Sequence, residues 1–289
     1  MKNNMYRNTF SIVMFAVLAF SCNNNAAKES VPQTTPLSIG IQLWTFHLAS
    51  FTTALEKVDS CDIRYIQAIS GQPIGNTAND SFSSYMPVRA KKYVQELLAK
   101  KEIQIKAYGV LNPQSREEWL QHFAFAKEMK IPLLVTEPIT AHWDYADSLA
   151  GVFNIKIAIH NHPAPAQYYH PDSVLAAMKN HSHIYACADI GHWARSGLDP
   201  VKCLQTLKGR IADVHFKDVA AFNVIEADNM LLGKGVIDLQ AIIEELQNQK
   251  YEGILTIEHE QNWENNVPDL LQNIKWLNDA FRKINYNQK

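Results

Sequence analysis

The chain has 289 residues, of which 47% are hydrophobic and 19% are charged, and its formal net charge at pH 7 is −2. This length and composition can bury a large core, which excludes a wholly disordered protein and favours one large domain. No cluster of Lys and Arg stands out, so we expect no nucleic acid partner.

Residues 1–22 are predicted to be an export signal. Lys2 and Arg7 give a positive amino-terminal region, Phe10 to Phe20 form an apolar core, and a short cleavage site occupies positions 19–22. A site that ends in cysteine resembles a bacterial lipobox. It implies that Cys22 carries a lipid anchor and that the protein is a membrane-anchored lipoprotein facing the periplasm. An ordinary secretory signal and an uncleaved anchor are the alternatives, although the apolar run is short for a membrane span.

Residues 23–36 are rich in Asn, Ala, Thr and Pro, which predicts a flexible tether. The folded domain is therefore expected to span residues 37–289. It contains Cys61, Cys187 and Cys203, with no CxxC spacing, so we expect neither a disulfide framework nor a structural zinc site.

From residue 37 onward, short β-prone apolar runs alternate with longer amphipathic runs, as in βα units around a parallel sheet. There are about eight such pairs, which predicts a single (β/α)8 TIM barrel of the α/β class. The expected strands are 38–44, 65–69, 104–110, 133–137, 156–160, 184–189, 211–217 and 253–258. The expected helices are 85–101, 116–130, 199–207, 238–249 and 266–283. In the helix over 116–130, Leu120, Phe123 and Met129 are expected to share the apolar face.

Two long connections interrupt this pattern. The polar stretch 70–84 is interpreted as an active-site loop, with a plain surface excursion as the alternative. The stretch 219–235 ends in Leu-Gly-Lys-Gly, whose glycines at 233 and 235 predict a tight turn near the pocket mouth. Phosphate binding at this turn is the weaker interpretation.

Ionisable side chains stand at the C-terminal ends of the predicted strands. Side chains alternate between the two faces of a strand, and charged groups inside a barrel gather at its C-terminal mouth. The residues expected to converge there are Glu137, His160, Asp189, His215 and Glu258. Carboxylates mixed with imidazoles suit Mn²⁺, Zn²⁺, Co²⁺ or Fe²⁺ better than Ca²⁺. We therefore predict one bound divalent metal ion.

Several of these residues have a structural alternative. Glu137 precedes Pro138 and could cap the next helix. Asp189 could cap the following turn, although a buried carboxylate needs a compensating charge. One of His160 and His162 is expected to bind substrate or donate a proton instead of contacting the metal.

Other candidates lie next to these positions. His192 could hold a metal ligand in place or touch substrate. Lys217 could pair with Asp218, or stabilise an oxyanion if it points inward. Glu260 is expected to be an outer carboxylate that contacts substrate, or equally a catalytic carboxylate. Trp44 and Trp193 lie just beyond predicted strand ends. Their indoles are expected to contact sugar rings, with core packing as the alternative.

Six short motifs follow one another along the folded part of the chain. They are Thr-Glu-Pro (136–138), Ile-His-Asn-His-Pro (159–163), Asp-Ile-Gly-His-Trp (189–193), His-Phe-Lys-Asp (215–218), Gly-Lys-Gly (233–235) and Ile-Glu-His-Glu (257–260). Their order and spacing resemble the xylose isomerase-like sugar phosphate isomerase/epimerase superfamily. The resemblance implies a TIM barrel with one divalent metal held by Glu, Asp, His and Glu. Residue by residue, three of these roles carry over to Asp189, His215 and Glu258.

The chain departs from this pattern on the fifth strand, where members such as the ketose epimerases have Glu and this chain has His160. Branches that read His-Asn-His or His-Pro-His there, including the inosose dehydratase-like one, are more similar. Either His160 replaces the missing ligand or Glu137 reaches over from the fourth strand. The departure argues against epimerisation by two glutamates.

The sequence thus predicts a divalent-metal-dependent carbohydrate enzyme that acts through an enediolate, either as an isomerase or epimerase or as a keto-sugar lyase or hydratase. Glu258 is the candidate base for isomerisation, and His160 or His162 for the lyase reaction. Export favours an unphosphorylated carbohydrate or glycoside as the small-molecule partner. The alternatives are a surface-tethered carbohydrate-binding lipoprotein without turnover and, less favoured, a metal-dependent phosphodiesterase of the apurinic endonuclease type. The oligomeric state is left open.

Overall fold

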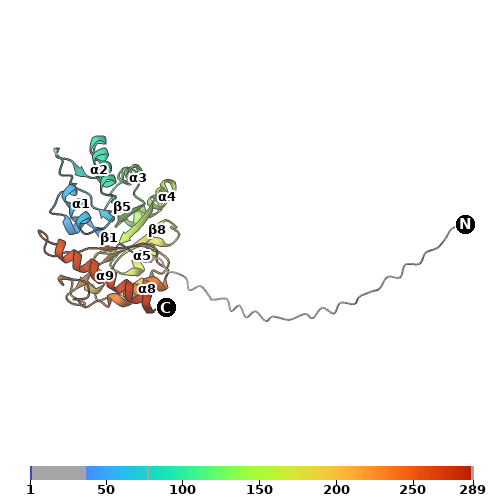
Figure 1. Cartoon of the computed structure of the whole chain (residues 1–289). Coiled ribbons are helices and arrows are strands. Elements are labelled where there is room, and N and C mark those ends of the chain that lie inside the picture. Colours follow the sequence, from blue (N-terminus) through green and yellow to red (C-terminus); the bar gives the residue numbers. More distant parts are fainter. Residues whose placement is uncertain (2–36, 77, 288–289) are drawn as a thin grey trace. The chain divides into compact units, whose positions relative to one another are not determined.

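The computed structural model describes residues 37–76 and 78–287, together with Met1 (Figure 1). Its centre is a closed barrel in which each neighbouring pair of strands is parallel. The barrel strands are β1 (Ser38–Gln42), β2 (Tyr65–Ala68), β5 (Gln104–Leu111), β6 (Leu133–Thr136), β7 (Lys156–His160), β8 (Ile184–Asp189), β9 (Ile211–Phe216) and β12 (Ile254–Ile257). They follow the order β1-β12-β9-β8-β7-β6-β5-β2, so that successive barrel strands are neighbours. The predicted (β/α)8 TIM barrel is confirmed.

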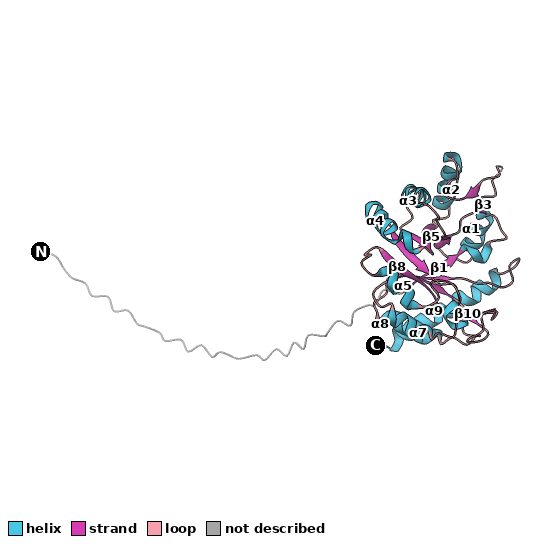
Figure 2. Cartoon of the chain, turned by 180° about the vertical axis from the view of Figure 1, so that it is seen from behind, coloured by secondary structure: helices cyan, strands magenta, loops and turns pink. Residues whose placement is uncertain are grey.

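Helices lie around the outside of the barrel, as Figures 1 and 2 show from opposite sides. They are α1 (Phe51–Ser60), α2 (Val88–Lys100), α3 (Arg116–Glu128), α4 (Trp143–Phe153), α5 (Pro171–Met178), α6 (Ile190–Arg195), α7 (Pro200–Thr206), α8 (Leu239–Asn248) and α9 (Val267–Asn287), with short 3-10 turns η1 (Leu43–Phe46) and η2 (Thr140–His142). None of the helices in the described part of the chain is both long and apolar enough to span a bilayer.

Polar residues begin several of these helices. The side chains of Ser50 and Ser115 accept hydrogen bonds from backbone N–H groups in the first turns of α1 and α3. Asp199 and Asp238 do the same for α7 and α8. Each cap satisfies N–H groups that have no partner inside the helix, which fixes where the helix starts.

The alternation of side chains along each strand separates two apolar layers. On β7, Ile157 and Ile159 point outward into the main core beneath the helices, whereas Ala158 points inward. The inward cluster consists of small and medium residues, namely Ala107, Leu133, Val135, Ala158 and Cys187. The same inward face carries polar residues toward the C-terminal ends of the strands.

The expected strands over 156–160 and 184–189 have the observed bounds, and most other predicted elements differ by a few residues. The strand expected over 38–44 ends at Gln42, because η1 begins at Leu43 and the side chain of Gln42 caps it. The expectation that Leu120 lies on the buried face of α3 is wrong, since this side chain is 46% exposed.

The two long connections each contain a small hairpin. The stretch 70–84 includes β3 (Gln72–Pro73) and β4 (Ser81–Phe82), and the other connection includes β10 (Asp218–Val219) and β11 (Asn229–Met230). The predicted export signal, the predicted lipidation site at Cys22 and the predicted tether lie outside the described residues, apart from Met1. The cysteines at 61, 187 and 203 are buried and free.

Candidate functional site

Four ionisable side chains meet at the C-terminal end of the barrel. His160 and Asp189 are the last residues of β7 and β8, His215 lies near the end of β9, and Glu258 directly follows β12. The register places His215 beside both Asp189 and Thr256, so strands far apart in the sequence deliver these groups to one level. One ligand atom from each of the four residues lies within 4.8 Å of the others, and all four side chains are buried. The sequence prediction that these residues converge therefore agrees with the geometry.

The atoms that face one another in this four-residue cluster are His160 Nε2, Asp189 Oδ2, His215 Nδ1 and Glu258 Oε2, and none of them forms a hydrogen bond of good geometry among the described residues. The ammonium of Lys217 lies 2.9 Å from both carboxylate oxygens, so ion pairing compensates their charge. Four buried polar atoms that converge in this way without well-formed hydrogen bonds are rare and need a cause. Two imidazole nitrogens and two carboxylate oxygens are suitable ligands for a borderline divalent ion. The residues therefore fit the metal site that the sequence predicted.

Asp189 has two separate roles in this arrangement. Its Oδ1 accepts the backbone N–H of His192 at 2.8 Å and so caps α6, while Oδ2 points into the cluster. The side chain of Asn161 holds the backbone of Asp189 through one donated and one accepted hydrogen bond, at 2.9 Å and 2.8 Å. The capping alternative for Asp189 is confirmed, and the cap uses only Oδ1, so Oδ2 still faces the cluster.

Lys217 follows β9 and its side chain has no exposed surface. Its Nζ lies 2.9 Å from both Asp189 Oδ2 and Glu258 Oε2, and 3.3 Å from Glu260 Oε1. The alternative that Lys217 pairs with Asp218 is wrong, because its ammonium points into the barrel mouth. Gly191 leaves room for this side chain, since a Cβ there would lie 2.4 Å from Lys217 Cγ.

The groups around the two acids determine their charge state. Burial alone would raise the pKa of Asp189, but the neighbouring His192 and the ammonium of Lys217 hold it well below its usual range. Burial likewise opposes ionisation of Glu258, and Lys217 and His215 lower its pKa below its usual range. Burial lowers the pKa of His192 well below its ordinary value, so this imidazole is uncharged at neutral pH. Both carboxylates are therefore ionised and able to bind a cation.

Glu137 lies on the outer side of His160 and does not belong to the four-residue cluster. Its Oε1 accepts a hydrogen bond from His160 Nδ1 at 3.3 Å and another from His162 Nδ1. Burial raises the pKa of Glu137, but these two hydrogen bonds outweigh it and lower the pKa to about 2. The hydrogen bond to Glu137 raises the pKa of His162, whose side chain is 48% exposed. The alternative that Glu137 caps the next helix is wrong, because Ile139 and His142 occupy the cap positions.

A second charged group borders the cluster. Arg195 on α6 donates to Glu260 Oε2 at 3.2 Å, to the backbone carbonyl of Ala227 at 3.0 Å and to His192 Nδ1 at 3.3 Å. Because a guanidinium only donates, His192 Nδ1 is the acceptor and Nε2 carries the proton. Nε2 lies 3.6 Å from Asp189 Oδ2. His192 is thus held as a neutral hydrogen-bond donor at the edge of the cluster.

The two candidate tryptophans differ sharply in exposure. Trp193 has no exposed surface and packs in the main core, which is the alternative to contact with a sugar ring. Trp44 is 44% exposed and stacks on His47, with ring centroids 4.4 Å apart. The exposed indole of Trp44 can therefore contact a ligand, while Trp193 has no free face for one.

Backbone N–H groups of the Gly-Lys-Gly turn bind the carboxylate of Asp218. This buried carboxylate accepts the backbone N–H groups of Gly233, Gly235 and Ile237 at 2.8–3.1 Å. Gly233 has a φ of +77°, as the predicted tight turn requires. Because the N–H groups of both glycines already have an acceptor, the geometry does not favour the phosphate-binding interpretation.

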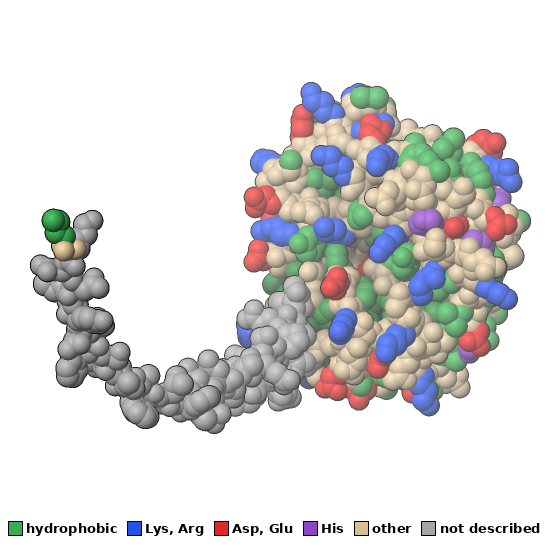
Figure 3. Space-filling view, turned by 90° about the vertical axis from the view of Figure 1, so that its right-hand side faces the viewer, with side chains coloured by type: hydrophobic (Ala, Val, Ile, Leu, Met, Phe, Trp, Pro, Cys, Tyr) green, Lys and Arg blue, Asp and Glu red, His purple; other side chains and the backbone are tan. Residues whose placement is uncertain are grey.

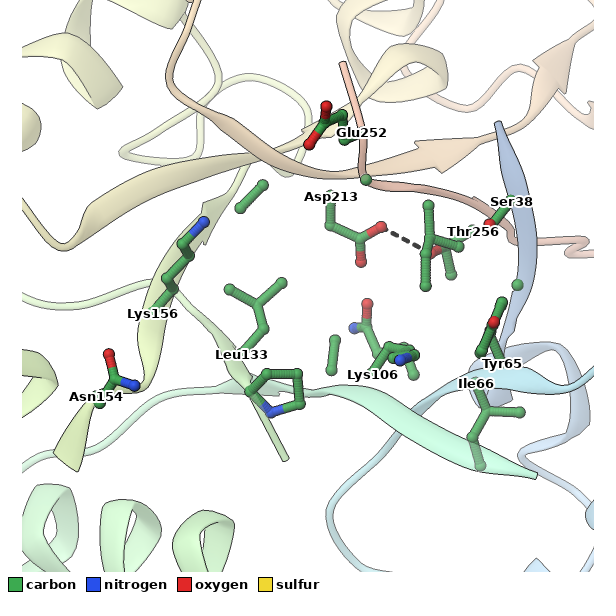
Figure 4. Close-up of a pocket in the computed structure, with 17 residues that line it drawn as sticks. Ser38, Tyr65, Ile66, Lys106, Leu133, Asn154, Lys156, Asp213, Glu252 and Thr256 are labelled. Atoms are coloured by element: carbon green, nitrogen blue, oxygen red, sulfur yellow. Dashed lines mark hydrogen bonds between the residues drawn. The ribbon is translucent and has the colours of Figure 1, made fainter. Parts of the chain in front are cut away.

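A cavity of about 490 Å³ lies at the opposite, N-terminal end of the barrel (Figure 4). It is lined by residues near the starts of the strands, including Ser38, Tyr65 and Lys156. Asp213 faces this cavity and accepts a hydrogen bond from Thr256 at 2.7 Å. None of the four clustered ligand residues lines it, so the metal chemistry belongs to the C-terminal end.

Sequence reasoning missed Gln67, Arg195 and Asn161, each of which contacts a residue of the site. Gln67 stands out only as a polar residue inside an apolar strand, and Arg195 as a residue one helical turn beyond His192.

On the face shown in Figure 3, Lys and Arg are interspersed with Asp and Glu, so this face carries no basic stripe.

Comparison with known proteins places this site in a family. The family model described as "Xylose isomerase-like TIM barrel" matches residues 111–280, which is more than half of the chain. The chain belongs to this family. Among solved structures, an uncharacterised protein from Parabacteroides distasonis is 30% identical with a TM-score of 0.70, covering 84% of this chain and 99% of that chain.

Two further proteins are similar to this chain, one in sequence and one in fold. Inosose dehydratase from Clostridium beijerinckii is 30% identical over 129 residues, which cover 39% of this chain and 43% of that protein. The chain thus matches less than half the length of this curated relative. The IOLI protein, solved with a zinc atom, has a TM-score of 0.67 and 16% identity, covering 86% of this chain and 99% of that chain, which shows a shared fold.

Proposed function

We propose that this protein is a divalent-metal-dependent lyase or hydratase that acts on keto-sugars. The observation that carries the proposal is the cluster of four buried, converging ligand atoms next to the His162–Glu137 pair and Lys217. The curated relatives named inosose dehydratase support elimination or addition of water over epimerisation. The family's related enzymes act on small sugar-like molecules, in agreement with the expected carbohydrate substrate.

The metal would be held by His160, Asp189, His215 and Glu258. In this assignment His160 replaces the glutamate of the ketose epimerases, because its Nε2 faces the cluster while Glu137 contacts only its Nδ1. A bound divalent ion would supply Lewis-acid stabilisation, worth several kcal/mol, for negative charge that develops on the substrate. The zinc atom in the IOLI protein of the same fold supports this cofactor class.

His162 is the proposed proton carrier. Its ring is half exposed, so a substrate in the barrel mouth can reach it, and Glu137 anchors Nδ1 and leaves Nε2 free. Nε2 of the neutral imidazole can take the proton from the carbon next to the carbonyl group, and the ionised Glu137 stabilises the imidazolium that forms. The imidazolium can then give this proton to the departing hydroxyl group, which leaves as water. The lowered pKa of Glu258 makes it a weak base and favours its role as a ligand.

Lys217, His192 and Glu260 complete the proposed substrate environment. Lys217 places a positive charge beside the cluster, and its field favours negative charge that develops on a bound substrate. His192 offers its Nε2 proton to a substrate oxygen. Arg195 and Lys217 both hold Glu260, which fixes its carboxylate for a sugar hydroxyl. Trp44 is the proposed apolar wall for a sugar ring.

Export and a lipid anchor at Cys22 remain part of this proposal. They imply that the enzyme meets unphosphorylated carbohydrates or glycosides outside the cytoplasm. The hydrophobic run and the cysteine-terminated cleavage site of the first 22 residues support this location.

The reaction is tested by incubating the full chain with Mn²⁺ or Zn²⁺ and a panel of keto-sugars in D₂O. We expect solvent deuterium in the product and the loss or gain of water, followed by mass spectrometry and NMR. The absence of both product and deuterium incorporation across the panel would refute the proposed chemistry.

The role of His162 is tested by His162→Asn. We expect kcat to fall by about 10²- to 10⁴-fold, because the proton carrier is lost, while metal content stays unchanged. His170→Asn is the matched control, since His170 is also partly exposed but lies at the start of α5. Equal kcat values in both variants would exclude His162 as the proton carrier.

A further inference from the structure

We infer that Gln67 is the positioning residue that turns the ring of His215 so that Nδ1 faces the metal cluster. The inference rests on the proposed metal dependence. Gln67 lies on β2 and is 1% exposed, and His215 has no exposed surface. Gln67 Oε1 is 2.8 Å from His215 Nε2, although the two residues are 148 positions apart in the chain.

A second hydrogen bond fixes the orientation of the Gln67 amide. Its Nε2 donates to the backbone carbonyl of Gly109 at 3.2 Å, which leaves Oε1 directed at His215. A carbonyl oxygen only accepts hydrogen bonds, so His215 Nε2 must carry the proton that is shared. His215 Nδ1 is then the nitrogen available to a cation, and it lies 3.0 Å from Glu258 Oε2.

His160 has the same arrangement with its nitrogens exchanged. Its Nδ1 is bonded to Glu137, and its Nε2 faces the cluster. Histidine ligands of metals typically donate their other N–H to a carboxylate or carbonyl group, which fixes the ring and raises its basicity. Each imidazole of the cluster thus has an outer acceptor, and for His215 it is Gln67.

A neutral amide suits the position of Gln67 better than a carboxylate. Asp189, Glu258 and Asp213 already place three carboxyl groups around His215 inside the barrel, with the ammonium of Lys217 on the mouth side. A further buried negative charge would add desolvation cost without a new cation. The amide supplies the acceptor without that charge.

The experiment compares Zn²⁺ affinity in three variants of the full chain by competition with a fluorescent chelator. Gln67→Leu removes the acceptor, and we expect Zn²⁺ to bind about 10- to 100-fold more weakly. Gln67→Glu restores an acceptor for His215 but loses the N–H donor to Gly109, and we expect it to bind Zn²⁺ more tightly than Gln67→Leu does. Gln72→Leu is the matched control, because Gln72 is another buried glutamine that bonds only to Phe46 and Ala49 among the described residues.

Wild-type affinity in Gln67→Leu, or an equal loss in Gln72→Leu, would overturn the inference. A second measurement does not depend on metal binding. In ¹⁵N–¹H spectra of the wild-type protein, the His215 Nε2 proton should be protected from exchange, and Gln67→Leu should lose this signal. If the wild-type protein binds no divalent ion, the proposed metal dependence fails, but the His215 Nε2 proton still tests the hydrogen bond to Gln67. If this proton is absent from the wild-type spectrum, the inference is contradicted, even if Gln67→Leu does not fold.

Discussion

A single buried ammonium compensates two buried carboxylates at the mouth of the barrel. Lys217 lies 2.9 Å from Asp189 and from Glu258, and all three side chains are buried. Lys217→Met should therefore destabilise the protein by about 3–5 kcal/mol in EDTA, because two buried charges lose their partner. Thermal unfolding in EDTA, and again with Zn²⁺, measures this loss.

Added Zn²⁺ should recover much of the stability of Lys217→Met, since a cation in the cluster compensates the same oxygens. Lys275→Met is the control, because Lys275 pairs with Asp279 on the exposed face of α9 and should contribute little. An unchanged melting temperature of Lys217→Met in EDTA would show that this ammonium does not stabilise the acids.

Residues at strand ends could be predicted from the sequence, whereas their supporting partners could not. Asp189, His215 and Glu258 each end an apolar run, and a closed barrel brings such ends together. The role of Gln67 depends on a contact with a residue 148 positions away, which local sequence does not encode. Arg195 was missed because only the fold of the 219–235 connection brings Ala227 to it.

At the scale of elements, the connection after β9 depends on one carboxylate. Asp218 accepts N–H groups from Gly233, Gly235 and Ile237. Asp218→Ala leaves these N–H groups without their acceptor, which should cost about 1–3 kcal/mol and loosen residues 231–237. Hydrogen exchange should show faster exchange for these amides.

The control for this prediction is Asp144→Ala, because the side chain of Asp144 is fully exposed and bonds only to His181 among the described residues. Exchange in residues 231–237 should not change in this variant. Equal exchange rates in wild type and Asp218→Ala would mean that the turn is held by other contacts.

The bounds of a strand or helix could be predicted accurately where the residues at its two ends give a clear sequence signal. The strand over 156–160 was predicted with the right bounds because polar residues flank a short apolar run. Helices α1, α4, α5 and α6 were not predicted. The six residues of α6 are too short to show a helical period, although Asp189 was recognised as a possible cap of the turn that follows it. Asp189 both ends β8 and caps α6.

Across the whole molecule, the two ends of the barrel perform different tasks. Toward the N-terminal end, Asp213 and Thr256 bond to each other beside a cavity, and the small inward residues of the strands leave this space open. Toward the C-terminal end, the next inward layer consists of charged groups that compensate one another. A cation bound there would join β7, β8, β9 and β12, which are consecutive around the barrel.

Because such a cation binds only the folded chain, it should stabilise the whole barrel. A divalent ion at 100 times its dissociation constant adds about 2.7 kcal/mol, which for a domain of this size raises Tm by roughly 5–10 °C. Calorimetry in EDTA and in Zn²⁺ or Mn²⁺ measures the shift. Asp189→Asn is the sharp comparison, because the amide oxygen can still cap α6 while the anionic ligand is lost. This variant should lose most of the metal-induced shift, and an equal shift in both proteins would place the cation elsewhere.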